Sequence, residues 1–170
     1  MNTKRFARTV AGGSWLVARS WLLMAAVALM TACAPAPQTS STPPAGSTMP
    51  ASIVDPYLAI EDGLARDNID QLRANAGNLA TAAAALGSPA VKIDTAAVQL
   101  ASATDIDDAR DKFGTLSDAV VAYMDGLHLK PGEGVRQAYC PMKQKPWLQK
   151  GDTIANPYYG SSMLTCGNFK

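Results

Sequence analysis

Apolar side chains recur at helical spacing between residues 53 and 127, in four segments joined by short loops. A spacing of three and four residues places such side chains on one face of a helix. Short loops make consecutive helices antiparallel neighbours. No part of this region alternates between apolar and polar residues as a half-buried strand does. The pattern therefore predicts an all-α fold, an up-down helical bundle of about four helices.

Capping residues mark where the expected helices begin and end. Asp55 has the character of an N-cap, with Pro56 at the first helical position, where a missing N–H costs no hydrogen bond. The other boundary signals, in chain order, are Asp67 at the start of the second helix, Gly87 at its end, Ser88 and Pro89 at the start of the third, and Thr104 or Asp105 at the start of the longest.

Beyond Gly126 the composition changes, and Pro and Gly recur every few residues. Because these residues interrupt long regular elements, we expect an irregular C-terminal cap on the bundle. The expected folded domain comprises residues 53–170, a length that suffices for one ordinary core. Its C-terminal Cys/Met motif region is residues 136–170.

The N-terminus has the pattern of a targeting segment. A positively charged start precedes an apolar run, residues 21–30, which is too short to span a bilayer. The run ends in Leu-Met-Thr-Ala-Cys, which resembles the lipobox of bacterial lipoproteins. That resemblance implies a signal peptide over residues 1–32 and lipidation of Cys33. The alternatives are an ordinary secretory signal and a lone structural cysteine.

Residues 33–52 are rich in Pro, Ser and Thr and predict a flexible tether. Ala34 occupies the position at which an Asp would retain a lipoprotein at the inner membrane. The resemblance to lipoproteins therefore implies a periplasmic protein that contacts the membrane through its N-terminal lipid anchor, at the outer membrane.

Charge is uneven along the expected domain. Residues 53–135 include six basic and 13 acidic side chains, whereas residues 136–170 include five basic and one acidic. A nucleic-acid-binding protein needs a dense basic face, which this distribution does not supply, so we expect no nucleic-acid partner. The positive C-terminal region would either dock on the acidic body or offset the charge of nearby thiolates.

Four sulfur side chains bracket the C-terminal region. Cys140 and Met142 lie two residues apart, and Met163 and Cys166 lie three apart. Thiolates and thioethers are soft ligands that select Cu(I) and related ions, so these four residues are a candidate metal site. The alternative is a Cys140–Cys166 disulfide, which an even cysteine pair tends to form in an oxidising compartment and which would stabilise the fold by about 3 kcal/mol.

Aromatic residues lie between the two halves of this sulfur pattern: Trp147 and the turn Asn-Pro-Tyr-Tyr-Gly at residues 156–160. They would form either a shell that keeps water from a Cu(I)–sulfur centre or simply the core of a small cap.

No familiar catalytic set is present, and we expect no enzyme. His128, the single histidine, stands where the fourth helix should end, a position that the helix macrodipole alone explains. A nucleophilic pair of His128 with Cys140 would lack an orienting group. The acidic residues between 105 and 111 are typical of a helix N-terminus rather than of a calcium site.

The C-terminal motifs and the fourth helical segment together resemble a known family. In chain order the motifs read YCPM, WL, NPYYG and ML-x-CG, and the helical segment matches the family pattern R-x-x-F-x-x-L-S at Arg110, Phe113, Leu116 and Ser117. The family is domain of unknown function 3347, found alone or appended to periplasmic copper and silver efflux adaptors. The resemblance covers residues 54–167 and implies a heavy-metal association, with an efflux system as a partner.

These features together predict a periplasmic lipoprotein that binds Cu(I) or Ag(I) through Cys140, Met142, Met163 and Cys166, in metal buffering, delivery or efflux. The alternative is a structural or protein-interaction module that is stapled by the disulfide and binds no metal.

Overall fold

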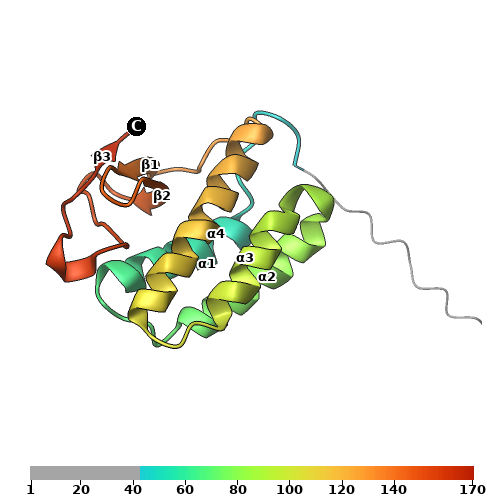
Figure 1. The fold of residues 1–170 in the computed structure, drawn as a ribbon. Coiled ribbons are helices and arrows are strands. Elements are labelled where there is room, and N and C mark those ends of the chain that lie inside the picture. Colours follow the sequence, from blue (N-terminus) through green and yellow to red (C-terminus); the bar gives the residue numbers. More distant parts are fainter. Residues whose placement is uncertain (1–42) are drawn as a thin grey trace, which may run out of the picture. The chain divides into compact units, whose positions relative to one another are not determined.

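The structure, a computed structural model, describes residues 43–170 (Figure 1). The expected signal peptide, residues 1–32, and the expected lipidation site, Cys33, lie outside the described residues. Among the residues that are described, no helix is long and apolar enough to cross a membrane.

Four α-helices form the body of the domain, and each packs against the next in the chain (Figure 1). They are α1 (Ala51–Ala65), α2 (Leu72–Leu86), α3 (Val91–Ala101) and α4 (Ile106–Gly126), with a short 3-10 turn at Ser88–Ala90 between α2 and α3. The predicted bundle of four helices is thus confirmed.

The prediction of a purely α-helical fold with an irregular cap was wrong. The C-terminal region contains a three-stranded antiparallel sheet of order β2-β1-β3. Its strands are β1 (Val135–Cys140), β2 (Lys145–Lys150) and β3 (Asn168–Phe169). The prolines permit this sheet because Pro146 lies in β2, an edge strand, where a missing N–H removes no ladder hydrogen bond.

The sheet lies against α1 and α4, on the side away from α2 and α3 (Figure 1). Side chains of these two helices bind the free edge of β2. The Tyr57 hydroxyl accepts a hydrogen bond from the Leu148 N–H (3.1 Å), and Ser117 Oγ donates to the Pro146 carbonyl (2.7 Å). Since Ser117 donates its only proton there, Tyr57 must donate to Ser117 Oγ, 2.6 Å away.

Helix α1 begins earlier than expected. The N–H groups of Ile53 and Val54 both bond to the carbonyl of Pro50, so Asp55 is not the N-cap and Pro56 lies inside the helix. Burial of Ile53 and Val54 stabilises these first turns despite the proline.

The second helix also begins elsewhere than expected, at Leu72 rather than at Asp67. Asp67 instead adopts a positive φ of 58° in the loop between α1 and α2. The N-cap of α4 is confirmed as Asp105, whose carboxylate accepts from the Asp108 N–H at 2.9 Å, and Gly87 ends α2 as predicted.

Part of the segment assigned to the tether belongs to the folded body. Met49 is 3% exposed, and its N–H donates to the Lys130 carbonyl at 2.9 Å. Thr48 pairs with Lys130 in a parallel β-bridge. Residues just before α1 are therefore held to the end of α4 and the chain that follows it.

Candidate thiol site

The two cysteines of the C-terminal region come together. Cys140 is the last residue of β1 and is fully buried, and Cys166 is partly buried just before β3. The antiparallel pairing of Tyr139 with Asn168 brings the two segments into register. Both cysteines are free thiols. Burial raises the pKa of Cys166, and the adjacent Cys140 thiol raises it further.

The two methionines lie in the turns beside the cysteines. Met142, in the turn between β1 and β2, is 60% exposed. Met163 is partly buried, and its carbonyl accepts from the Cys166 N–H at 3.0 Å, which closes a turn over residues 163–166. The structure therefore brings the two thiols close together. A cluster of all four sulfurs stays a prediction.

The hairpin turn after Cys140 supplies a donor to its sulfur. The backbone N–H of Lys143 points to Cys140 Sγ, with an N–S distance of 3.4 Å. The Lys143 ammonium pairs with Asp111 at 2.7 Å, and this carboxylate, with a smaller contribution from Cys140, raises the lysine pKa. A second pair joins Lys145 to Asp118. The positive C-terminal region thus docks on the acidic helix α4.

Asn156 fixes the segment that positions Cys166. Its buried side chain donates to the Cys166 carbonyl and accepts from the Tyr158 N–H at 2.8 Å. Its backbone N–H donates to Leu164 O at 2.7 Å, and its carbonyl accepts from Gly160. The sequence signalled a turn here, but it gave no indication that this asparagine also holds the chain before Cys166.

Trp147 and Tyr158 are buried in the C-terminal region, near the two cysteines. Their rings meet edge to face at a centroid distance of 5.9 Å, and both belong to the hydrophobic core. Gly167 lies directly on Trp147, because a Cβ there would be 2.5 Å from the indole. The Trp147 N–H donates to the buried Gln149 side chain at 3.0 Å. These aromatics are core residues next to the thiols.

The R-x-x-F-x-x-L-S residues of α4 face the C-terminal region. Phe113 packs between Tyr57 and Tyr158, at ring-centroid distances of 5.3 and 5.7 Å. Ser117 bonds to β2 as described above, and Leu116 is fully buried. The helical pattern is therefore a docking face for the segment that carries the cysteines.

His128 has a structural role. It stands just after α4 with a φ of 54°, and the Leu129 N–H donates to Met124 O while the His128 N–H donates to Asp125 O. This is the hydrogen-bonding pattern of a Schellman C-cap. His128 is exposed.

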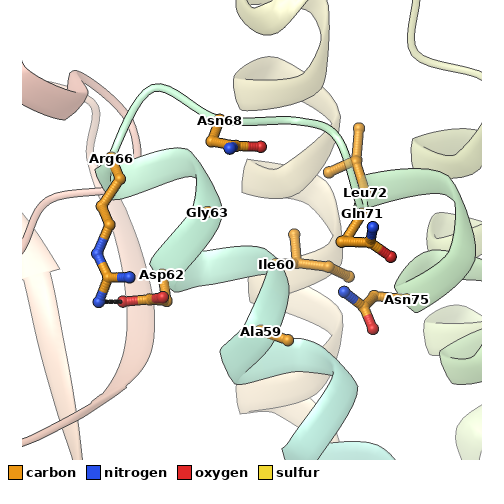
Figure 2. A pocket seen from close by; sticks show the side chains of 9 residues that line it. All are labelled: Ala59, Ile60, Asp62, Gly63, Arg66, Asn68, Gln71, Leu72 and Asn75. Carbon is orange, nitrogen blue, oxygen red and sulfur yellow. Dashed lines mark ion pairs between the residues drawn. The ribbon is translucent and has the colours of Figure 1, made fainter.

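A groove of about 340 Å³ lies between the end of α1, the loop that follows it and the start of α2 (Figure 2). Figure 2 shows the Asp62–Arg66 ion pair, at 2.6 Å, on the α1 side of the groove, Gln71 and Asn75 on the opposite side, and Asn68 on the loop that joins the two helices. None of the residues predicted to bind metal lines this groove.

The helical body matches a known family model. Residues 53–132 match the family described as "Protein of unknown function (DUF3347)". The expected match to this family is confirmed over the helical body. The match includes the R-x-x-F-x-x-L-S pattern of α4 and ends before Cys140. No curated protein and no solved structure matches the chain.

Proposed function

We propose that the protein binds one soft metal ion, Cu(I) or Ag(I), as cargo through the thiolates of Cys140 and Cys166. The observation that carries this proposal is the approach of these two cysteines, from opposite ends of the C-terminal region, in the folded chain. Two thiolates are the soft donor set that such ions prefer. The Lys143 N–H directed at Cys140 Sγ would help to stabilise a thiolate there.

The two cysteines differ in access. Cys140 is fully buried and Cys166 is partly exposed, so an incoming ion would meet Cys166 first. Met163 begins the turn that ends at Cys166, and the exposed Met142 lies two residues from Cys140. Both thioethers are flexible soft donors that would add affinity at the rim of the site.

Binding of this kind suits a metal-buffering or metal-delivery protein rather than an enzyme. With the lipobox-like segment before Cys33, it leads us to place the protein in the periplasm, anchored by lipid to the outer membrane, with a heavy-metal efflux system as its partner. Cys33→Ser should release the protein from the membrane fraction, and unchanged association with membranes would contradict lipidation.

The alternative function rests on the same proximity of the cysteines. If they form a disulfide in the oxidising periplasm, they staple β1 to the chain before β3, and the domain is a structural or protein-interaction module without metal. Protein purified from the periplasm would then have no free thiol in this region.

Copper stoichiometry under reducing, anaerobic conditions separates the two functions. Titration against a competing Cu(I) chelator should give about one ion per chain, and Cys140→Ser or Cys166→Ser should abolish tight binding. Met142→Ala combined with Met163→Ala should weaken binding without unfolding the protein. Met124→Leu, a buried substitution of similar volume on α4, is the matched control. A stoichiometry near zero for the wild type would overturn the proposal.

A further inference from the structure

Glu61 is a carboxyl group buried on an apolar helix face. It lies on the apolar face of α1, four residues after Tyr57 and three before Leu64, and is 5% exposed. Its Oε1 atom has no hydrogen-bond partner among the described residues. Burying such a group without a compensating interaction costs free energy. The proposed copper site makes no use of it.

Glu61 lines a groove of about 340 Å³ between α1 and the end of β2. Two more carboxylates of α1, Asp55 and Asp62, line the same groove. Asp62 is paired with Arg66 at 2.6 Å, so Asp55 supplies the negative charge beside Glu61 that no described residue pairs. Apolar side chains form the rest of its α1 wall and part of the opposite wall: Leu58, Ala59 and Ala155.

The spacing of these carboxylates argues against a bound metal ion. Asp55 and Asp62 are seven residues apart on one helix, or about 10 Å along its axis, so they cannot ligate one small ion together. Within residues 43–170, no group of three His, Cys, Asp or Glu side chains is placed to hold a metal. An acidic groove with apolar walls suits an organic cation on a hydrocarbon stem.

We propose that this groove binds an aliphatic ammonium or guanidinium group, with the Glu61 carboxylate as its counter-ion. The hydrocarbon stem would pack on Leu58, Ala59 and Ala155. Asp55, which has no ion pair with another described residue, would attract the cation to the groove. A guanidinium would pair with the carboxylate through two parallel hydrogen bonds, which makes it the better ligand of the two.

Lys150 could compete with an added cation for Glu61. It lines the same groove from the end of β2, it is exposed, and it makes no ion pair with another described residue. If the Lys150 ammonium pairs with Glu61, an added cation can bind only after Lys150 is replaced. The variant Lys150→Met therefore belongs in the test.

The probes are n-butylguanidine and n-butylamine, with n-butanol as the uncharged control, added to the metal-free protein at pH 8.5. Amide chemical shifts of α1 and β2 should move on titration with either cation, more strongly with the guanidine, and not with the alcohol. Glu61→Gln should weaken binding at least tenfold. Asp125→Asn, an exposed carboxylate on α4, should leave it unchanged.

Capped arginine, N-acetyl-arginine amide, distinguishes the source of the cation. Binding equal to that of n-butylguanidine would assign the groove to a side chain of a partner protein, and much weaker binding would assign it to a small free cation. The proposal is overturned if wild-type protein binds neither cation, if only Lys150→Met binds, or if Glu61→Gln binds as tightly as the wild type. Copper is absent throughout, so the result is independent of the thiol site.

Discussion

Arg110 on α4 donates a hydrogen bond from its Nε atom to the backbone carbonyl of Pro157, at an N–O distance of 3.3 Å. The first residue of R-x-x-F-x-x-L-S thereby binds the turn Asn-Pro-Tyr-Tyr-Gly. The same guanidinium donates to the Leu64 carbonyl at 3.3 Å and pairs with Asp67. One side chain thus joins α1, α4 and the C-terminal turn, and the two sequence motifs form one structural unit.

Arg110→Met should lower the free energy of unfolding by about 2–3 kcal/mol, because it leaves two backbone carbonyls and the Asp67 carboxylate without their charged donor. Urea denaturation measures the change. Arg66→Met is the matched control, since its pair with Asp62 is exposed on both sides and should contribute less than about 1 kcal/mol. Equal losses in the two variants would contradict the linking role of Arg110.

Gly160→Ala should be among the most damaging small substitutions in the domain. Gly160 has a φ of 53°, and a Cβ there would lie 2.0 Å from Asp67 Oδ1 and 2.2 Å from an Arg110 nitrogen. The methyl group would separate this ion pair from the turn, so we expect a loss of about 3 kcal/mol or more in unfolding free energy.

Gly151→Ala isolates the backbone part of that effect. Gly151 also has a positive φ, 88°, but a Cβ there would meet nothing within 4 Å. It should cost only about 1 kcal/mol, the strain of a left-handed conformation. If the two alanine variants have the same unfolding midpoint in urea, the contact with Asp67 and Arg110 is not important.

The helical body was predictable because its signals are local. Stripes such as Ile60, Leu64 and Phe113, Leu116 repeat at helical spacing, and Asp105 and Gly87 mark boundaries by their own chemistry. Asp67 was misread because its carboxylate binds Arg110 and the Ser161 N–H, far along the chain, rather than a helix N-terminus. Tertiary contacts of that kind leave no local pattern.

The sheet was missed for a related reason. Trp147, Leu148 and Gln149 are consecutive and all buried, because β2 packs between β1 and the helices. A strand covered in this way lacks the alternation of apolar and polar residues that identifies a half-buried strand. The backbone groups on the outer edge of β2 form hydrogen bonds with the hydroxyls of Tyr57 and Ser117. No periodicity in the sequence reveals these bonds.

The candidate sites were predictable to different degrees. Residue type and number singled out Cys140 and Cys166, and the structure brings them close together, whereas metal binding or a disulfide between them stays a prediction. Glu61 was overlooked, although its position between Tyr57 and Leu64 on the apolar face of a helix was a usable signal. Asn156 was read only as a turn residue, because its bond to the Cys166 carbonyl depends on the folded turn.

Tyr57→Phe should lower the free energy of unfolding by about 1–3 kcal/mol. The variant leaves the buried Leu148 N–H without an acceptor and removes the proton donated to Ser117. Tyr123→Phe is the matched control, because the Tyr123 hydroxyl is buried without a partner among the described residues. Removing the Tyr123 hydroxyl should leave the free energy of unfolding unchanged or raise it slightly in the same denaturation experiment. The reverse order of the two variants would contradict the hydroxyl network.

Glu61 makes stability depend on pH. Burial, with a smaller contribution from Asp62, raises the pKa of Glu61 from 4.5 to about 8 in the folded protein. The folded state therefore binds more protons than the unfolded state between these two values, and stability must fall as pH rises through this window. The contribution of Glu61 is complete below pH 4.5 and is lost as pH passes about 8.

Glu61→Gln should remove this dependence, because the amide stays neutral at every pH. The difference in unfolding free energy between Glu61→Gln and the wild type should grow in favour of the variant by about 4 kcal/mol from pH 5 to pH 9. Thermal or urea unfolding across this range measures the slope. Asp125→Asn, which removes an exposed carboxylate, should follow the wild-type curve. Parallel curves for Glu61→Gln and the wild type would show that the buried carboxyl finds a partner in solution. Lys150 lines the same groove and has no ion pair with another described residue, so if it is that partner, Lys150→Met should restore the slope.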